Sequence, residues 1–158
     1  MFFTGSKFDK YGNLNNWWKN GSFERFQEHT SCMVKQYENY TSQGKQIDGV
    51  KTLAENIADN GGLKLAFKAY KDWLKHHPAE QKLPSFDLTP EQLFFVAFAQ
   101  VWCSSSTESK AKESLLTDDH SPEIIRVLAA VHNSKDFANA FNCPRNSPMN
   151  PSEKCQIW

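Results

Sequence analysis

The sequence predicts a mainly helical fold that ends in an irregular tail, and three observations support this fold class. Apolar residues recur at spacings of three, four and seven through most of the interior, as they do on one face of an α-helix. Capping residues, in one case followed by a proline, precede several of these stretches. The end of the chain (CPRNSPMNPSEKCQIW) is rich in proline and lacks such a pattern. We therefore expect packed helices followed by a non-helical C-terminal segment.

Size and composition limit the possible classes of protein. The chain has 158 residues, which is the usual length of one domain of about 100–200 residues. Hydrophobic residues make up 39% and aromatic residues 13%, which excludes disorder for most of the chain. Lys and Arg together number 18, as do Asp and Glu, so nothing indicates a nucleic-acid or anionic membrane partner. The longest uncharged apolar run, Leu93 to Cys103, is too short to span a bilayer, which needs ~20 residues.

The N-terminal third is expected to contain one helix between two irregular segments. Residues 1–21 are rich in Gly and Asn and indicate a loop or a short strand. From Ser22 to about Tyr40, apolar residues at helical spacing predict an amphipathic helix that buries one side. Ser42 to Val50 then forms a polar turn.

A second helix is expected to begin at Thr52 and to continue to Leu74. Thr52 and Glu55 have the spacing of a capping box. The triplet Asn60-Gly61-Gly62 interrupts the helical composition at a cost of about 1 kcal/mol for each Gly relative to Ala, yet the apolar pattern resumes at once. Either a break in the helix or a close packing contact is expected there.

The second half of the chain is expected to hold further helices. Residues 78–88 form a connector, after which Thr89-Pro90-Glu91 supplies a cap, a first-position proline and an acid for a buried helix through Cys103. Three shorter elements follow: a helix over Lys110 to Leu116, a helix or strand over Ser121 to Val131, and a helix over Lys135 to Phe141 capped by Ser134.

Glu55 and Asp59 are four residues apart, so a helix places both carboxylates on one face. One interpretation is a solvated polar face on which Glu55 acts as a cap. The other is that one carboxylate binds a metal ion while the other orients a neighbouring histidine ligand, as zinc sites require. The spacing alone does not distinguish them.

His120 follows two aspartates and precedes Arg126 by six residues. A histidine beside a carboxylate is suited to donating a hydrogen bond to a developing oxyanion, and arginine offers a planar donor fork for a peptide carbonyl. Most loop histidines are nevertheless inert. The remaining histidines lack acidic partners at ligand spacing, and we interpret them as solvated or locally bonded: His29, His76, His77 and His132.

The four cysteines and two glycosylation sequons favour an extracellular protein. Without any C-x-x-C spacing the cysteines exclude a zinc ribbon or a thioredoxin-like motif, which leaves disulfides or buried thiols. The sequons begin at Asn20 and Asn39. Since the sequence has no export signal at its start, we expect that an N-terminal portion of the protein is missing.

Several motifs, in order along nearly the whole chain, resemble the neprilysin and endothelin-converting-enzyme zinc metallopeptidases, specifically their C-terminal part. They are FDKYGNL with Trp17-Trp18, ENIADNGGL from Glu55, LTPEQLFF from Leu88, FAQVWC from Phe98, His120-Ser121-Pro122, FNCP from Phe141, Met149-Asn150-Pro151 and CQIW from Cys155. The resemblance implies that residues 1–158 are the C-terminal portion of one thermolysin-like (zincin-like) catalytic domain.

The resemblance assigns a role to each candidate residue. Glu55 matches a zinc ligand, and Asp59 matches the carboxylate that fixes a ligand imidazole. His120, with Asp118 as its partner, matches the residue that stabilises the oxyanion. The substrate-binding residues follow in the same way: Arg126 holds a backbone carbonyl, and Val101 and Trp102 form walls of the pocket for the side chain after the scissile bond.

One departure from the family is decisive for activity. The family's other zinc ligands and its general base lie in a His-Glu-x-x-His motif, and these 158 residues contain no such motif. A structural or catalytic zinc site needs at least three protein ligands. We therefore expect peptidase activity, on the amino side of hydrophobic residues, only together with the N-terminal remainder of the protein. The alternative is a non-catalytic product that binds peptides as a decoy.

The resemblance also implies how the cysteines pair. Cys32 should pair with Cys155, closing a loop of about 120 residues. Cys103 and Cys143 resemble cysteines whose partners lie in the missing N-terminal region, so both are expected to be unpaired in this chain.

Overall fold

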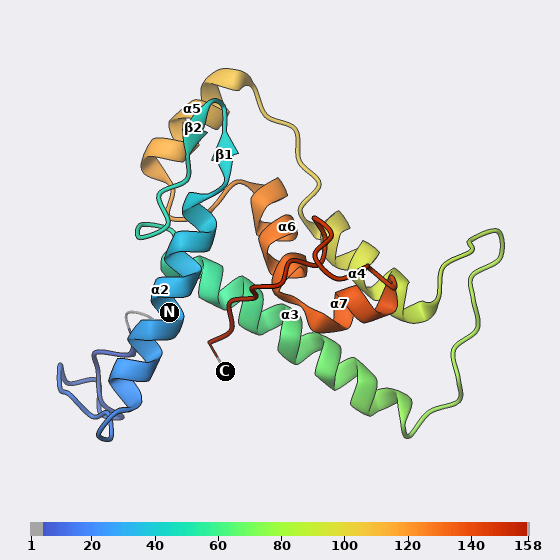
Figure 1. Ribbon diagram of the computed structural model, residues 1–158, viewed down its shortest axis with the longest axis horizontal. Helices are drawn as coiled ribbons and strands as arrows, with labels where there is room; N and C mark the ends of the chain where they lie inside the picture. The colour runs from blue at the N-terminus through green and yellow to red at the C-terminus, as the bar shows by residue number, and fades with distance from the viewer. Residues whose placement is uncertain (1–4, 158) are drawn as a thin grey trace.

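The computed structural model describes residues 5–157, and these are mainly helical (Figure 1). The elements in chain order are α2 (Ser22–Glu38), β1 (Thr41–Ser42), β2 (Lys45–Gln46), α3 (Leu53–Leu74), α4 (Pro90–Val101), α5 (Glu108–Thr117), α6 (Glu123–Asn133) and α7 (Lys135–Ala140). The predicted fold class, mainly helical with an irregular tail, is confirmed.

Helix α2 starts where the apolar pattern predicted, and it buries Phe26, Met33 and Tyr37. The next segment contains a small antiparallel hairpin in which Thr41 pairs with Gln46. Gln43 and Gly44 have positive φ angles (52° and 72°) and make its turn. The sequence predicted only a polar turn for this segment, because strands of two residues are too short to show an alternating pattern of apolar and polar residues.

Helix α3 runs without interruption through Asn60-Gly61-Gly62. A Cβ atom added at Gly62 would meet no heavy atom within 4 Å, so neither a break nor a close contact explains this glycine. The packed residues on either side, Ile57 and Leu63, keep the helix continuous through a segment of low helix propensity.

The predicted capping box at the start of α3 is wrong. Thr52 makes no side-chain cap bond, and its hydroxyl instead donates to the carbonyl of Asp48 at 2.8 Å. The reason lies in the backbone of Thr52, which is already near-helical (φ −88°, ψ −1°) rather than extended as an N-cap residue usually is.

Helix α4 has the predicted cap and first-position proline at its start, and the cap is part of a capping box that was not predicted. The Thr89 hydroxyl accepts from the Gln92 backbone N–H at 3.2 Å, and the Gln92 side chain accepts from the Thr89 N–H at 2.8 Å. The helix ends at Val101 rather than at Cys103, and it is not buried as expected. Phe95 is its one buried residue, because α4 packs on one side, against α3 and α7, and Val101 is 74% exposed.

The last three helices differ from the expected elements in length or type. Helix α5 is longer than predicted, and the ambiguous segment after it is the helix α6 rather than a strand. Helix α7 ends one residue before Phe141, and its expected cap is present, since the Ser134 hydroxyl accepts from the Phe137 N–H at 3.0 Å.

Two hydrophobic clusters hold α3 against its neighbours. The first joins α2, the first half of α3 and α6, and consists of Phe26, Met33, Tyr37, Ile47, Leu53, Ile57, Ile125, Ala129 and Cys155. The second joins the second half of α3 to α4 and to the α6–α7 region, and consists of Leu63, Phe67, Phe95, Ala130 and Val131. Helices α3 and α6 therefore both contribute to the two clusters and connect them.

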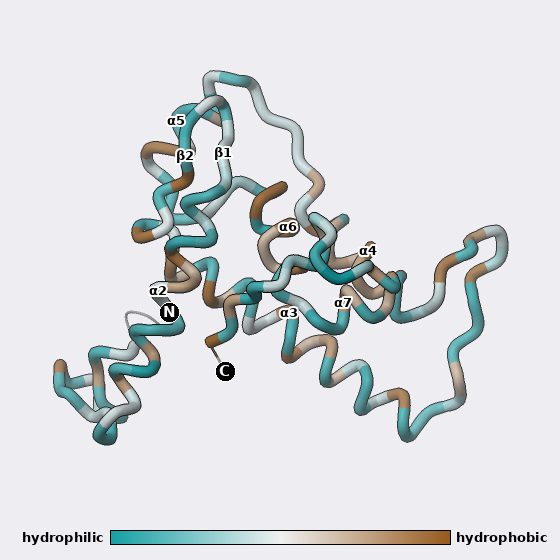
Figure 2. Tube along the Cα trace, in the orientation of Figure 1, coloured by the Kyte–Doolittle hydropathy of each residue, from teal (hydrophilic) through white to brown (hydrophobic). Residues whose placement is uncertain are grey.

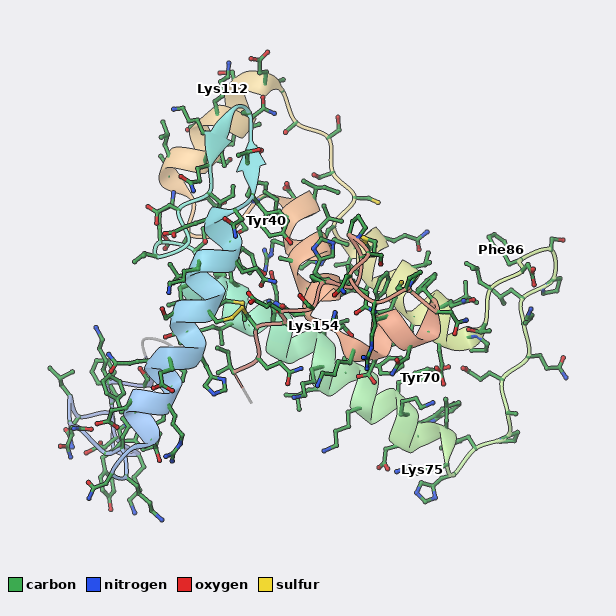
Figure 3. The ribbon with its side chains drawn as sticks, in the orientation of Figure 1. Tyr40, Tyr70, Lys75, Phe86, Lys112 and Lys154 are labelled. Atoms are coloured by element: carbon green, nitrogen blue, oxygen red, sulfur yellow. A yellow bond between two sulfur atoms is a disulfide. The ribbon has the colours of Figure 1, made fainter. Side chains whose placement is uncertain are left out.

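The C-terminal tail crosses the molecule between α2 and α7, and a disulfide joins Cys155 of the tail to Cys32 of α2 (Figure 3). Cys103 and Cys143 are free.

The loop between α3 and α4, with Phe86 on it, extends away from the rest and is largely hydrophilic, as is the N-terminal segment (Figure 2). Within residues 5–157, no helix combines the length and the apolarity that a membrane crossing requires.

Candidate functional site

The predicted site residues come together where the first half of α3 faces the start of α6. Glu55 and Asp59 project from α3, and Arg126 projects from α6. Asp118 and His120 lie on the connection between α5 and α6. Two contacts bridge these elements: His120 reaches Glu55, and Arg126 reaches Asp59.

The His120 imidazole lies between two carboxylates. Its Nδ1 is 2.7 Å from Oδ1 of Asp118, and its Nε2 is 3.2 Å from Oε2 of Glu55. The His120 backbone N–H also donates to Asp118 at 2.9 Å. This backbone hydrogen bond, followed by the side-chain bond from His120, lowers the pKa of Asp118 below its ordinary value. Asp118 is thus an ionised anchor that fixes both the backbone and the ring of His120.

Asp59 and Arg126 form a largely buried bidentate pair. Nε and Nη2 of Arg126 donate to the two carboxylate oxygens at 2.6 and 2.7 Å, and the side chains are only 8% and 12% exposed. Burial would lower the pKa of Arg126, but the hydrogen bonds and charge of Asp59 hold it above its ordinary value. The guanidinium also lies 3.8 Å over the Trp102 ring, a cation–π contact. Together these contacts fix the position of the Arg126 fork.

A cavity of about 450 Å³ opens beside these groups. Its lining combines charged, aromatic and apolar side chains, including Val101, Trp102, Leu115, Asp118, His120 and Arg126. Val101 and Trp102 therefore line the same cavity as His120 and Arg126. A surface of this kind can accept an apolar side chain beside a polar backbone group.

The described residues of this chain do not form a zinc site by themselves. Among residues 5–157, no three His, Cys, Asp or Glu side chains are grouped closely enough to hold a metal ion. Both oxygens of Asp59 are bonded to Arg126, and Nδ1 of His120 is bonded to Asp118. Of the two candidate carboxylates on α3, Glu55, with its side chain 31% exposed, is the one that is not held by Arg126 and could serve as a single ligand.

Two residues of the site were missed by the sequence analysis. Asn56 is completely buried next to Glu55, and its side-chain oxygen accepts from the Ser121 hydroxyl at 2.8 Å. These residues are 65 positions apart, and neither type is rare on a helix or in a turn. No local pattern in the sequence could have paired them.

The interpretation of the other histidines as solvated or locally bonded fits His29, His76 and His77, which are exposed, but is wrong for His132, which is partly buried and contacts residues far away in the sequence. His77 Nδ1 lies 2.8 Å from the Trp73 carbonyl oxygen, and His29 contacts the Gln156 carbonyl. His132 contacts the Tyr40 hydroxyl at 2.7 Å, and His76 is exposed.

Asn20 and Asn39, the sequon asparagines, are also exposed, one just before α2 and the other at its C-terminal end. A glycan could therefore be attached at either position without unfolding a helix.

Comparisons with known proteins point to one family. The sequence profile of Peptidase family M13 matches residues 1–157. The chain is 54% identical over 154 residues to endothelin-converting enzyme 1 of Bos taurus and 50% identical to neprilysin-1 of Caenorhabditis elegans, in each case over 98% of the chain. It covers only 20% and 21% of those proteins, so it spans about a fifth of the length of these curated relatives.

Solved structures agree with the sequence comparisons. The zinc metalloprotease Zmp1 of Mycobacterium tuberculosis, in complex with an inhibitor, superposes with a TM-score of 0.86 at 33% identity. A Haemonchus galactose-containing glycoprotein complex superposes with a TM-score of 0.89, also at 33% identity. Each likeness covers 98% of this chain, and 24% and 26% of the respective solved chain.

Proposed function

We propose that this chain, which belongs to peptidase family M13, is the C-terminal part of the catalytic domain of a zinc metalloendopeptidase. The resemblance to the neprilysin and endothelin-converting-enzyme family is confirmed by the profile match and by the identities above. Two observations support the proposal that residues 1–158 are part of a larger domain. The chain spans a fifth of its curated relatives, and its described residues hold too few ligands for zinc.

The observation that carries the proposal is the placement of the Glu55 carboxylate. It faces Nε2 of His120 at 3.2 Å, at the junction of α3 with the loop before α6, rather than pointing into bulk solvent. We assign to Glu55 the role of one zinc ligand, with the remaining ligands and the general base supplied by residues outside this chain. Zinc would polarise the substrate carbonyl and lower the pKa of a bound water.

The other residues act on the substrate. His120, held by Asp118 through its backbone and its ring, donates a hydrogen bond to the oxyanion that develops as the scissile carbonyl is attacked. Arg126, fixed by Asp59 and Trp102, donates to a backbone carbonyl of the peptide. Each carboxylate oxygen of Asp59 keeps a further lone pair, so Asp59 can also orient a ligand imidazole, as the family resemblance implied.

The cavity beside Val101 and Trp102 accounts for the proposed specificity. An apolar side chain that follows the scissile bond would pack against the Trp102 ring and Val101 while its backbone carbonyl meets Arg126. We therefore propose cleavage on the amino side of hydrophobic residues. Desolvation of an apolar side chain in such a pocket favours binding by roughly 1.5–3 kcal/mol.

We also propose that the parent protein acts outside the cell. Disulfides such as Cys32–Cys155 persist in oxidising compartments, and the exposed sequon asparagines Asn20 and Asn39 are accessible to glycosylation. Analysis of the secreted or surface-exposed protein by mass spectrometry, before and after removal of N-linked glycans, tests both statements. A protein found only inside the cell and without glycans would contradict them.

The peptidase proposal is tested with two proteins, the full-length protein that contains this chain and the 158-residue chain alone. The full-length protein should contain about one zinc per molecule and cut a peptide library before Phe or Leu, as read by mass spectrometry of the products. The chain alone should bind no stoichiometric zinc and hydrolyse nothing. Turnover with bound zinc by the chain alone would refute the assigned ligand set. Tight peptide binding by the chain alone, without zinc, would favour the decoy alternative.

A further inference from the structure

A buried hydrogen bond joins α3 to the loop that carries His120. The Ser121 hydroxyl donates to Oδ1 of Asn56 at 2.8 Å, and both residues are buried, with 0% exposure for Asn56 and 3% for Ser121. Each of them is the immediate neighbour of a site residue, since Asn56 follows Glu55 and Ser121 follows His120. The bond therefore connects the two segments that meet at the Glu55–His120 contact.

The Asn56 side chain is itself held in place. Its Nδ2 donates to the Thr52 hydroxyl at 2.9 Å, and the Thr52 hydroxyl donates to the Asp48 carbonyl at 2.8 Å. The Asn56 backbone carbonyl accepts from the Asn60 side chain at 2.8 Å. Both ends of the carboxamide are thus satisfied, so its oxygen presents a fixed acceptor to Ser121.

The loop has few other attachments. Within the loop that follows α5, residues 118–120 are exposed and Ser121 is buried. His120 contacts Asp118, but Asp118 belongs to the same loop and moves with it. The partly exposed contact between His120 and Glu55 is weak by comparison with a buried, fully satisfied hydrogen bond. The hydrogen bond from Ser121 to Asn56 is therefore the main contact that anchors this loop to α3.

From this arrangement we propose that Asn56 and Ser121 are positioning residues, whose hydrogen bond fixes His120 relative to Glu55 and so sets the geometry of the oxyanion donor. The role of the bond in catalysis rests on the proposed peptidase function, but the anchoring of the loop does not. An asparagine suits this position because it accepts from Ser121 and donates to Thr52 without a charge. Aspartate would lack the donor and would bury a charge, and leucine would lack both groups.

The test compares Ser121→Ala with a matched control, Thr30→Val, in the full-length protein. Each substitution removes one buried hydroxyl, and Thr30 donates only within α2, to the Gln27 carbonyl at 2.9 Å. In the metal-free protein, Ser121→Ala should at least double the rate of deuterium uptake over residues 117–122, and Thr30→Val should not. Ser121→Ala keeps nearly all the side-chain volume, so the fold is retained. Asn56→Ala should have the same local effect.

Kinetics provide the second readout. Ser121→Ala should leave the zinc content and KM unchanged and should lower kcat roughly tenfold. Small displacements of a catalytic group have large effects on rate. A kcat equal to that of Thr30→Val would overturn the positioning role, and unchanged deuterium uptake would overturn the anchoring itself. A wild-type protein without peptidase activity would refute the proposed function but would leave the exchange result to decide the anchoring.

Discussion

The charged side chains of the site differ in burial, and this difference separates their roles. Asp59 and Arg126 are 8% and 12% exposed, whereas Glu55, Asp118 and His120 are 31–47% exposed. The buried pair is satisfied within the protein and holds α3 against α6. The more exposed side chains, those of Glu55, Asp118 and His120, remain accessible to a ligand or substrate. A rigid ion pair thus supports a more accessible set of catalytic groups.

The buried pair leads to a prediction about stability. Arg126→Ala leaves the Asp59 carboxylate buried without its cation and removes the contact with Trp102, so the free energy of unfolding should fall by about 3–5 kcal/mol. Urea denaturation followed by tryptophan fluorescence measures this change. The double variant Asp59→Ala/Arg126→Ala leaves no unpaired charge and should be more stable than Arg126→Ala alone. A double variant that is less stable than Arg126→Ala would contradict this account.

His132 leads to a prediction about pH. Burial, and then the charge of Lys154, lower the pKa of His132 below its ordinary value of 6.5, and its ring contacts the Tyr40 hydroxyl and the Met149 sulfur. The unfolded chain therefore binds more protons than the folded chain as the pH falls below 6.5, and stability decreases there. The melting temperature should drop between pH 7.5 and pH 5.5. His132→Gln cannot titrate and should show a smaller drop; an equal drop would exclude His132 as the cause.

At the scale of single elements, α4 has the clearest sequence signal and gives the next prediction. Its capping box satisfies two backbone groups at once, so Thr89→Ala should cost about 1 kcal/mol of stability. Thr89→Ser keeps the accepting hydroxyl and should cost much less. Thermal denaturation of the two variants beside the wild type measures the difference. Equal losses in both variants would mean that the methyl group of Thr89, and not the cap, is what matters.

The helices were predictable where a local signal marked them. Thr89-Pro90-Glu91 located the start of α4, and the apolar spacing after Ser22 located α2. The start of α3 was wrongly assigned to a capping box, because the spacing of Thr52 and Glu55 does not reveal that the Thr52 backbone is already near-helical. Likewise, the exposure of α4 depends on which elements pack against it, and the sequence pattern does not contain that information.

The contacts within the site could not be predicted from the sequence either. Spacing and residue type singled out Glu55, Asp59, His120 and Arg126, the resemblance assigned their roles, and the structure brings the residues together. Their partnerships could not be predicted, because Asp59 and Arg126 are 67 positions apart. Long-range pairs of this kind are set by how α3 and α6 pack, and no periodicity encodes them.

At the scale of the whole molecule, one disulfide closes most of the chain. Cys32 and Cys155 are 123 positions apart, so loss of the bond should lower stability by about 4–5 kcal/mol in the chain-entropy treatment. The double variant Cys32→Ser/Cys155→Ser, compared with wild type by urea denaturation, tests this. Cys103→Ser, made in the same 158-residue chain, is the matched control, since Cys103 is free and exposed there and should change stability little. Similar losses in both proteins would mean that the disulfide contributes no special stability.

The proposed mechanism requires Glu55 to be a metal ligand and His120 not to be one. Zinc content of the full-length protein, measured by mass spectrometry for Glu55→Ala and His120→Ala beside the wild type, tests this most directly. We predict that Glu55→Ala loses its zinc, whereas His120→Ala retains about one zinc per molecule but hydrolyses peptides far more slowly. Equal zinc contents in the two variants, whether both retained or both lost, would contradict the roles assigned to these residues.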